Sequence, residues 1–461
     1  MKSYTDYDVP KFHSIYDIFL LFSKEYKELV AFEGLASKIT YHQLSRDIKS
    51  LTSRLEKYKG RYVLITAKDS YLFAVSYFGT IMAGAVAVLS DTGEQKIIEK
   101  MDIAITLNDE VAKTETQKGD KDYNPCICKK TDTLSTILFS SGTLSAQKGV
   151  MLSENNICVN VKSGLEKYLM KKGDRYINLI PYYHAFGLVC DLLAPLCVGA
   201  TICMLDKREL FVQRMVYYKP TILNVPPAIA KTILKLLETG LPVESVTGGR
   251  LKKLLCGGAH YDKSTAMALE KYGIMSYGCY GTTECSPCIS VNRDSYYKHG
   301  SAGVALNCNE IKLADDGEIL IKGENVMLGY FNDDEATKKA IKDGYYHTGD
   351  LGFIDEDGFL YVTGRKSNLI AFDDGTKLTA EEVEQDILQN TEASEVLVYS
   401  ESRNDKIAIS FRIYVSDMKS QEAIKGYIKE KYKKYNIGAV EISNTPLPKT
   451  SIGKIRRTYE N

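Results

Sequence analysis

The sequence predicts an α/β protein with a large N-terminal domain of helix-covered, mostly parallel sheets, a small β subdomain and a small α+β domain at the C-terminus. Short, continuously apolar runs such as residues 62–65 and 83–89 alternate with helical patterns. Apolar strands between helices are typical of parallel sheets that helices cover on both faces. The 461 residues also exceed what one simple core holds, so we expect two or more domains.

Helices in the N-terminal half follow from the spacing of apolar residues. Leucines and an isoleucine between residues 44 and 55 recur at helical spacing, and residues 71–82 are also helical in pattern. Ser153 is placed to cap a helix that runs to about Met170. Further strands are expected at residues 176–180, 200–205, 221–225 and 251–256.

The last third of the chain reads as hairpins followed by a compact α+β unit. Asp-Asp-Gly at 315–317 predicts a hairpin turn before an alternating strand. Thr379 and Glu382 have the spacing of a capping box at the start of a helix. Residues 394–437 alternate between strand and helix patterns. The C-terminal part therefore has enough elements for a small domain of its own.

Composition and charge favour an ordinary globular protein. Apolar residues make up 44% of the chain, and charged residues 26%. Lys plus Arg equals Asp plus Glu at 59 each, so no overall field indicates nucleic acid or an anionic membrane as a partner. The most apolar run, residues 188–205, contains Asp191, Pro195 and Gly199, which favours a buried helix end and strand over a transmembrane segment.

The eleven cysteines are expected to be buried free thiols in a reducing cytosol. Cys285 and Cys288 form a lone C-x-x-C without a second pair, which argues against a zinc site. The first ten residues lack the charged and apolar segments of a secretion signal. We therefore expect a cytoplasmic location.

The segment 136–150 is the first candidate for a binding site. After an apolar run it contains Ser140, Ser141, Gly142, Thr143 and Lys148. Hydroxyls, free backbone N–H groups and a lysine suit a polyphosphate, although G-x-x-x-x-G-K-[ST] does not fit this loop. Taken alone, the segment is more simply interpreted as an exposed turn.

Further motifs follow in the same chain. Gly258 and Ala259 come directly after a predicted strand, where glycine lets a flat ring approach the backbone. His184 lies among aromatic residues, where a packed structural histidine is the simpler interpretation. The remaining motifs are Tyr280-Gly281-Thr282-Thr283-Glu284, Thr348-Gly349-Asp350, Gly364-Arg365 and Pro448-Lys449-Thr450-Ser451-Ile452-Gly453-Lys454.

Together these motifs resemble the adenylate-forming superfamily, which contains acyl-CoA synthetases, peptide-synthetase adenylation domains and firefly luciferase. The loop at 140–149 is similar to the T-S-G-T-T-G-x-P-K-G signature of that superfamily, with departures at Leu144, Ser145 and Gln147. The other motifs match in order from residue 182 to residue 454. The resemblance implies ATP-dependent activation of a carboxylic acid to an acyl-adenylate, with release of pyrophosphate.

The resemblance also implies a role for each motif. The hydroxyl loop and Lys148 would hold pyrophosphate, and Glu284 with Thr143 would bind Mg²⁺. Lys454 would bridge the acid and the α-phosphate, and His184 would border the acid. The nucleotide contacts would be Gly258 and Ala259 on adenine, Tyr280 stacked on the base beside Gly281, Thr283 on the α-phosphate, and Asp350 and Arg365 on the ribose.

The same resemblance divides the chain into residues 1–364, a hinge at about 365–367 and a mobile C-terminal domain at 368–461. Rotation about the hinge would withdraw Lys454 and admit a thiol that attacks the acyl-adenylate. Ser367 and Asn368 replace residues that are usually charged in the superfamily, and Ala371 replaces a lysine that many members have. Transfer to a thiol is therefore less firmly implied than adenylation.

The function expected from the sequence is that of an acyl-CoA synthetase that uses ATP, Mg²⁺ and CoA. Residues 374–384 are most similar to fatty acyl-CoA synthetases, although Ala380 stands where those enzymes have proline. A free-standing adenylation enzyme that loads a carrier-protein thiol is the first alternative. A nucleotide-binding relative without catalysis is the second, because of the altered loop at Leu144, Ser145 and Gln147.

Overall fold

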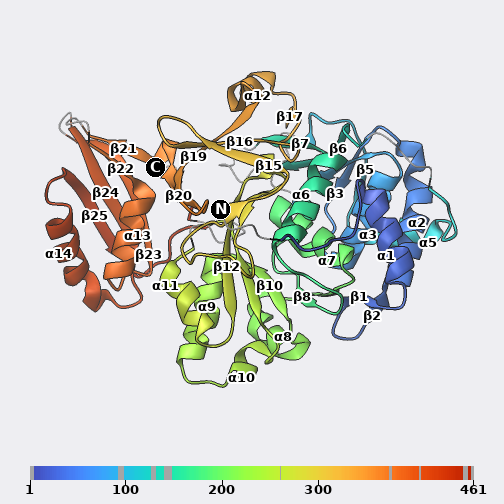
Figure 1. Cartoon of the computed structure of the whole chain (residues 1–461), viewed down its shortest axis with the longest axis horizontal. Coiled ribbons are helices and arrows are strands. Elements are labelled where there is room, and N and C mark those ends of the chain that lie inside the picture. Colours follow the sequence, from blue (N-terminus) through green and yellow to red (C-terminus); the bar gives the residue numbers. More distant parts are fainter. Residues whose placement is uncertain are drawn as a thin grey trace. The chain divides into compact units, whose positions relative to one another are not determined.

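The structure is a computed structural model that describes residues 5–91, 98–125, 131–139, 148–259, 261–372, 376–403, 406–449 and 455–457. Its chain divides into two compact units. The first unit consists of Met1–Ile311, Ile321–Tyr346 and Glu356–Leu360, and the second of Lys312–Leu320, His347–Asp355 and Tyr361–Asn461. Figure 1 shows the helices and strands along the chain.

The first sheet of the first unit has the strand order β17-β7-β6-β4-β3-β5. Its parallel core is β3 (Tyr62–Ile65), β4 (Val86–Leu89), β5 (Ile103–Leu107) and β6 (Leu134–Phe139). Strands β7 (Gly149–Ser153) and β17 (Gly329–Tyr330) continue it in antiparallel fashion. Helices that pack around this sheet are α1 (Ile15–Glu25), α2 (Tyr41–Leu55), α3 (Ser70–Met82), α5 (Asp109–Lys118) and α6 (Glu154–Lys167) (Figure 1).

The second sheet has the order β10-β11-β12-β13-β14. Strands β10 (Ile222–Val225), β11 (Lys253–Cys256) and β12 (Met275–Gly281) are parallel, whereas β13 (Cys288–Val291) and β14 (Val304–Ala305) are antiparallel. Its helices are α8 (Phe211–Tyr218), α9 (Pro227–Glu238), α10 (Val243–Thr247) and α11 (Lys263–Glu270), and they share one buried apolar core with the strands. Apolar strands alternate with helices here as the sequence predicted.

A third sheet of the first unit has the order β2-β1-β9-β8. It consists of β1 (Val30–Glu33), β2 (Lys38–Thr40), β8 (Arg175–Ile177) and β9 (Thr201–Cys203). Between β8 and β9 the chain forms a π-helix at Gly187–Leu193 and α7 (Ala194–Cys197), where the sequence predicted only a helix end. A π-helix was not predicted because the apolar run has the same pattern in either kind of helix.

The second unit has a small α+β core. Strands β23 (Glu395–Arg403) and β24 (Lys406–Tyr414) are antiparallel, and β25 (Ile437–Ser443) is parallel to β24. Helices α13 (Ala380–Asn390) and α14 (Gln421–Lys431) pack on them, and β21 (Leu369–Ala371) pairs with β22 (Lys377–Thr379). Strands β15 (Asn309–Leu313), β16 (Glu318–Gly323), β19 (Tyr345–Ile354) and β20 (Leu360–Arg365) supply residues to both units, and β18 (Ile341–Lys342) and α12 (Asp334–Ala340) belong to the first.

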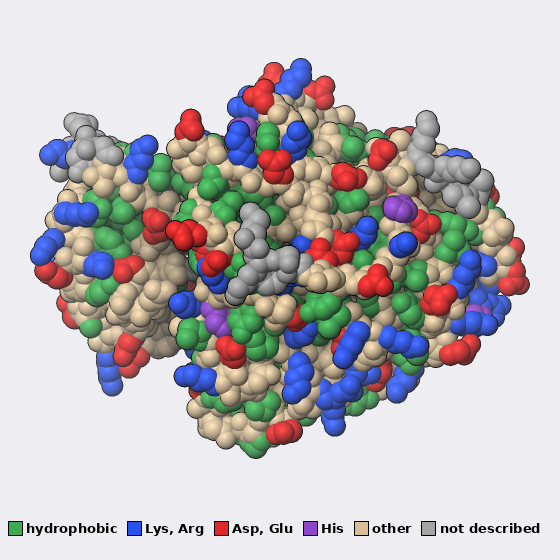
Figure 2. Space-filling view, viewed as in Figure 1, with side chains coloured by type: hydrophobic (Ala, Val, Ile, Leu, Met, Phe, Trp, Pro, Cys, Tyr) green, Lys and Arg blue, Asp and Glu red, His purple; other side chains and the backbone are tan. Residues whose placement is uncertain are grey.

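These elements confirm the predicted α/β class, with parallel sheets, helices and a small C-terminal α+β unit. Both predicted helix starts are confirmed: Ser153 caps α6 and Thr379 caps α13 through capping boxes. The nine described cysteines are free thiols, eight of them buried. Acidic and basic side chains are interspersed on the face shown in Figure 2. Among the described residues, no helix has the length and apolar character needed to cross a membrane.

Candidate active site

Two predicted nucleotide motifs lie at one edge of the second sheet. Gly258 and Ala259 follow the carboxyl end of β11, and Tyr280 lies near the carboxyl end of β12, its parallel neighbour. Gly258 has φ +83°, a conformation that favours glycine, and both it and Ala259 are exposed. Ligands of α/β sheets bind outside the carboxyl ends of strands. The fold therefore brings these segments to an edge where a nucleotide could bind.

Glu284 lies in a short 3₁₀ turn, Thr283–Cys285, directly after β12, and its backbone is held from several sides. The Glu284 carbonyl accepts a hydrogen bond from the Met327 N–H at 2.8 Å. The side-chain amides of Asn160 and Asn325 both donate to the Cys285 carbonyl, at 3.1 and 2.9 Å. These hydrogen bonds tie the loop to α6 and to the segment just before β17.

The Glu284 side chain meets Tyr330 and, through it, Lys148. Tyr330 Oη donates to Glu284 Oε1 at 2.9 Å. The Lys148 ammonium lies over the Tyr330 ring, with Nζ 4.5 Å from its centroid. Burial, followed by the negative charge of Glu284, raises the pKa of Tyr330 far above its ordinary value, so the hydroxyl stays protonated and acts as a donor. The predicted pyrophosphate lysine and the predicted metal carboxylate are thus joined by one tyrosine.

His184 lies at the start of the helical segment that contains the π-helix. Its ring is half-buried, with a centroid 4.7 Å from that of Tyr183. Its backbone carbonyl accepts from the Leu188 N–H at 2.9 Å. Nearby in sequence, Asp191 is fully buried and accepts from the Ile180 N–H and the Asn224 amide at 3.1 and 2.7 Å. These contacts fix the segment that carries His184.

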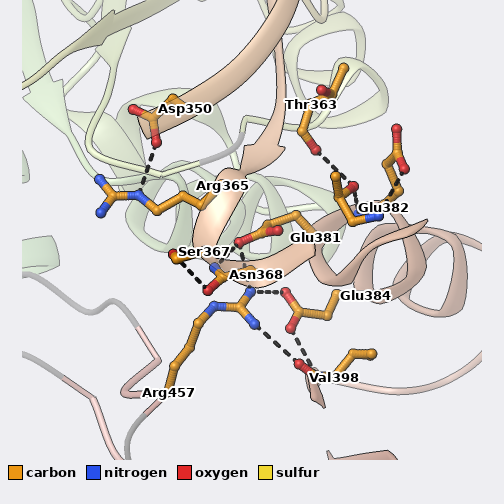
Figure 3. A network of polar contacts seen from close by, with 11 residues as sticks. Asp350, Thr363, Arg365, Ser367, Asn368, Glu381, Glu382, Glu384, Val398 and Arg457 are labelled. Carbon is orange, nitrogen blue, oxygen red and sulfur yellow. Dashed lines mark hydrogen bonds and ion pairs between the residues drawn. The ribbon is translucent and has the colours of Figure 1, made fainter. Parts of the chain in front are cut away.

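In the second unit, Asp350 and Arg365 form an ion pair with Nε 2.9 Å from Oδ1 (Figure 3). The Asp350 side chain is buried and that of Arg365 is more than half exposed. The Asp350 N–H donates to Thr348 Oγ1 at 3.0 Å, and the Thr348 hydroxyl in turn donates to the Ile319 carbonyl at 2.8 Å. The two residues predicted to contact the ribose therefore come together.

A second network in that unit surrounds Arg457 (Figure 3). Its guanidinium contacts Glu384 and Glu381 of α13 at 2.7 and 3.1 Å and the Val398 carbonyl at 3.2 Å. The Asn368 amide donates to the same Glu381 carboxylate at 2.5 Å. One carboxylate thus joins a residue just after the predicted hinge to the end of the chain.

Five predicted site residues lie outside the described residues. They are Ser140, Ser141, Gly142, Thr143 and Lys454. On the two sides of residues 450–454, Lys449 and Ile455 form a β-bridge, and the Arg456 N–H donates to the Pro448 carbonyl at 2.8 Å. The catalytic, nucleotide-binding and metal-binding roles of the site residues stay predictions.

Sequence reasoning did not single out the links made by Tyr330, Arg457 and Asn368. The contacts of Tyr330 depend on the pairing of β17 with β7. A buried tyrosine or an arginine near glutamates gives no signal in sequence, because the pairing partners lie more than 40 residues away.

The comparisons with known proteins agree with these motifs. The profile of the AMP-binding enzyme family matches residues 90–331. A 2-succinylbenzoate–CoA ligase of Bacillus cereus is 28% identical and aligns over 93% of this chain and 94% of its own length. A probable 4-coumarate–CoA ligase of Dictyostelium discoideum is 31% identical over 63% of this chain, which spans about half (55%) of that relative.

Solved structures share the fold. The anthranilate–CoA ligase AuaEII, in complex with anthranoyl-AMP, superposes with a TM-score of 0.85 at 19% identity, over 97% of this chain and 96% of the other. The o-succinylbenzoate–CoA synthetase of Bacillus subtilis, in complex with ATP and a magnesium ion, superposes with a TM-score of 0.80 at 22% identity, over 95% of this chain and 98% of the other. With the motifs, the fold and a family match over more than half of its length, the chain belongs to the AMP-binding enzyme family of the adenylate-forming superfamily.

Proposed function

We propose that this enzyme activates a carboxylic acid with ATP and then transfers the acyl group to the thiol of CoA. It is an AMP-forming acid–thiol ligase whose substrates are a small-molecule acid, ATP and CoA. The observation that carries the proposal is the convergence of Lys148 and Glu284, 136 residues apart, on Tyr330. A lysine for phosphate and a carboxylate for a metal, held together, are what a bound polyphosphate requires.

In the first step a carboxylate oxygen attacks the α-phosphorus of ATP, the bond from that phosphorus to the bridging oxygen breaks, and pyrophosphate leaves. Both reactants are anions, so positioning and neutralisation of charge dominate catalysis. Lys148 with the hydroxyl loop would hold the pyrophosphate end, and Lys454 would bridge acid and α-phosphate. Tyr280 and Gly258 would contact the base, and Asp350 with Arg365 the ribose.

The residues at Glu284 fit a magnesium ion. Mg²⁺ usually binds one or two protein carboxylates together with phosphate oxygens and water. Glu284 is half-buried, and Tyr330 donates to one of its two carboxylate oxygens. Among the described residues, no group of three or more His, Cys, Asp or Glu could hold a metal by itself. Glu284 would therefore hold Mg²⁺ together with ATP, and the ion would neutralise phosphate charge.

An aromatic acid is the better proposal for the substrate than the fatty acid expected from residues 374–384. The relatives over most of the chain are named 2-succinylbenzoate–CoA ligases, and another is named a probable 4-coumarate–CoA ligase.

Two alternatives remain open from the sequence. A carrier-protein thiol could replace CoA as the acceptor, and the altered loop at Leu144, Ser145 and Gln147 motivates a relative that binds nucleotide without reaction. The CoA-ligase names of the relatives favour CoA. The paired Lys148–Tyr330–Glu284 and Asp350–Arg365 contacts favour catalysis over binding alone.

Acid-dependent exchange of labelled pyrophosphate into ATP tests the first step. We expect exchange with aromatic acids and weaker exchange with long-chain acids. CoA and a set of phosphopantetheine carrier proteins, offered in parallel, then identify the acceptor by thioester formation. ATP binding without exchange across short, long and aromatic acids would reject the ligase in favour of the non-catalytic alternative.

A further inference from the structure

We propose that Tyr330 is a positioning residue that aligns the magnesium carboxylate Glu284 with the pyrophosphate lysine Lys148. This inference deepens the proposed function and rests on it. The hydroxyl and the ring of Tyr330 serve different partners, because Oη donates to Glu284 Oε1 at 2.9 Å and the ring face lies 4.5 Å from Lys148 Nζ. The two contacts can therefore be removed one at a time.

The position of Tyr330 is set by strand pairing. Gly329 and Tyr330 of β17 pair with Met151 and Val150 of β7, the strand that directly follows Lys148. The Phe331 N–H donates to the Gly149 carbonyl at 2.7 Å. The Tyr330 N–H donates to the Thr337 hydroxyl at 2.9 Å, which ties it to α12 as well. Only 6% of Tyr330 is exposed, so its side chain is held by its surroundings.

The hydroxyl fixes which way the carboxylate faces. A donor on Oε1 constrains rotation of the Glu284 carboxylate while taking only one of its two oxygens. Partners that orient a metal ligand in this way typically account for about 10- to 100-fold in metal affinity or activity.

The ring acts on the lysine. An ammonium over an aromatic face is attracted to it but keeps its N–H groups for other acceptors. Lys148 can therefore remain on the Tyr330 ring and still donate to phosphate oxygens. The carboxylate that would hold the metal and the ammonium that would hold pyrophosphate are consequently set by the same side chain.

Tyr330→Phe removes the hydroxyl and keeps the ring. We expect the Mg²⁺ concentration for half-maximal pyrophosphate exchange to rise about tenfold. The half-saturating pyrophosphate concentration should stay within twofold. Calorimetry gives a readout independent of turnover: binding of ATP with Mg²⁺ should weaken, whereas binding of ATP in EDTA should not change.

Tyr330→Leu removes the hydroxyl and the ring. We expect it to show the same magnesium effect and, in addition, a rise of about three- to tenfold in half-saturating pyrophosphate. Thermal melting of both variants checks the fold, and Tyr330→Phe loses only one buried oxygen.

The chain offers a matched control in Tyr345→Phe. Tyr345 repeats the arrangement at a partly exposed position, with its hydroxyl 3.3 Å from Glu310 Oε1 and Lys322 Nζ 5.8 Å from its ring centroid. Tyr345→Phe should leave the half-maximal Mg²⁺ concentration and the half-saturating pyrophosphate concentration unchanged. A magnesium dependence of Tyr330→Phe equal to that of the wild type would overturn the inference. Absence of exchange in the wild type itself would instead reject the proposed function.

Discussion

At the scale of single residues, the Asp350–Arg365 pair joins a buried carboxylate to an exposed guanidinium. Asp350 is 4% exposed, and a buried carboxylate is stable only when it is paired or hydrogen-bonded. The 2.9 Å contact with Arg365 provides the pairing, and the exposed guanidinium leaves one side of the pair open to solvent.

We predict that Asp350→Asn weakens ATP binding. A carboxylate can accept both ribose hydroxyls, whereas an amide offers one acceptor oxygen. Loss of one hydrogen bond to a charged group costs about 1.5–3 kcal/mol, so the Michaelis constant for ATP should rise about 10- to 100-fold. Steady-state pyrophosphate exchange at varied ATP measures it.

Asp102→Asn is the control for this prediction, because Asp102 forms an exposed ion pair with Arg61 at 2.8 Å. Asp102→Asn should leave the Michaelis constant for ATP unchanged. An unchanged Michaelis constant in Asp350→Asn would count against a ribose contact.

Sequence alone identified candidate site residues that lie in short motifs. Glu284 and Asp350 were singled out because their motifs resemble those of the adenylate-forming superfamily, and their roles stay predictions. The link through Tyr330 could not be predicted, since it depends on β17 and β7 pairing across 179 residues between Val150 and Tyr330. Motifs indicate which groups react, and strand pairing decides which groups orient them.

At the scale of elements, Glu154 joins two helices. It lies in the first turn of α6, and its Oε2 accepts from the Ile15 N–H at the start of α1 at 2.9 Å. Burial, opposed by that hydrogen bond and assisted by Asp17, raises the pKa of Glu154 to about 7. The folded protein therefore keeps the proton between about pH 4.5 and 7, where the unfolded chain has released it.

Glu154→Gln should remove a pH dependence of stability. A raised carboxyl pKa contributes stability that is present at low pH and is lost as pH rises through about 7. Wild-type stability should therefore fall relative to that of the variant between pH 5 and 8, by on the order of 2 kcal/mol. Urea unfolding at both pH values measures the difference.

Glu110→Gln replaces an exposed residue in the first turn of α5. Its free energy of unfolding should change with pH in the same way as that of the wild type. Parallel pH profiles of the wild type and Glu154→Gln would show that Glu154 titrates normally.

Arg457, a described residue near Lys454, is linked to two other elements of the second unit. It follows Lys454 by three residues and contacts two glutamates of α13 and a carbonyl of β23. Replacing Arg457 should displace Lys454 and leave unchanged the residues that act in the transfer of the acyl group to the thiol. We predict that Arg457→Met lowers the rate of adenylation about tenfold, because small displacements of a catalytic group have such effects. Stopped-flow measurement of pyrophosphate release tests it.

The matched variant is Arg412→Met, because Arg412 contacts Glu441 at 2.9 Å in the same unit. It should leave adenylation unchanged. Thioester formation from supplied acyl-adenylate should be nearly unaffected in both variants. A loss in Arg457→Met that is equal for both steps would indicate general damage to the unit.

Local signals explain why some elements could be predicted and others not. The caps of α6 and α13 were predictable because Ser153 and Thr379 each bond within three residues. The π-helix at Gly187–Leu193 was not, because its apolar run has the same pattern in either kind of helix. Elements determined by their own residues are readable from sequence, whereas tertiary contacts decide the rest.

At the scale of the whole molecule, the predicted machinery is divided between the two units. Lys148, Tyr280 and Glu284 belong to the first unit, and Asp350 and Arg365 to the second. The division is not a single cut, because Lys312–Leu320 and His347–Asp355 group with the C-terminal part. Two units, the second of them small, were predictable from the pattern at 394–437, and the hinge at about 365–367 stays a prediction.

Lys454 provides the test at this scale, since its sequence position places it in the second unit. If that unit presents the lysine for adenylation and withdraws it before the thiol enters, the two half-reactions should respond differently to Lys454→Ala. We predict that adenylation falls by about 10²- to 10³-fold, the usual cost of removing one charge-stabilising donor. Thioester formation from supplied acyl-adenylate and CoA should be nearly intact.

Both steps can be followed separately, by pyrophosphate release and by acyl-CoA formation. Lys433→Ala serves as the control, because Lys433 forms a surface pair with Glu430 at 2.6 Å on the same unit. It should change neither step. An equal loss of both half-reactions in Lys454→Ala would mean that the lysine acts in both steps or supports the fold. A loss confined to adenylation would require the lysine to be present for one step and dispensable for the other, which a unit that changes position between the steps provides.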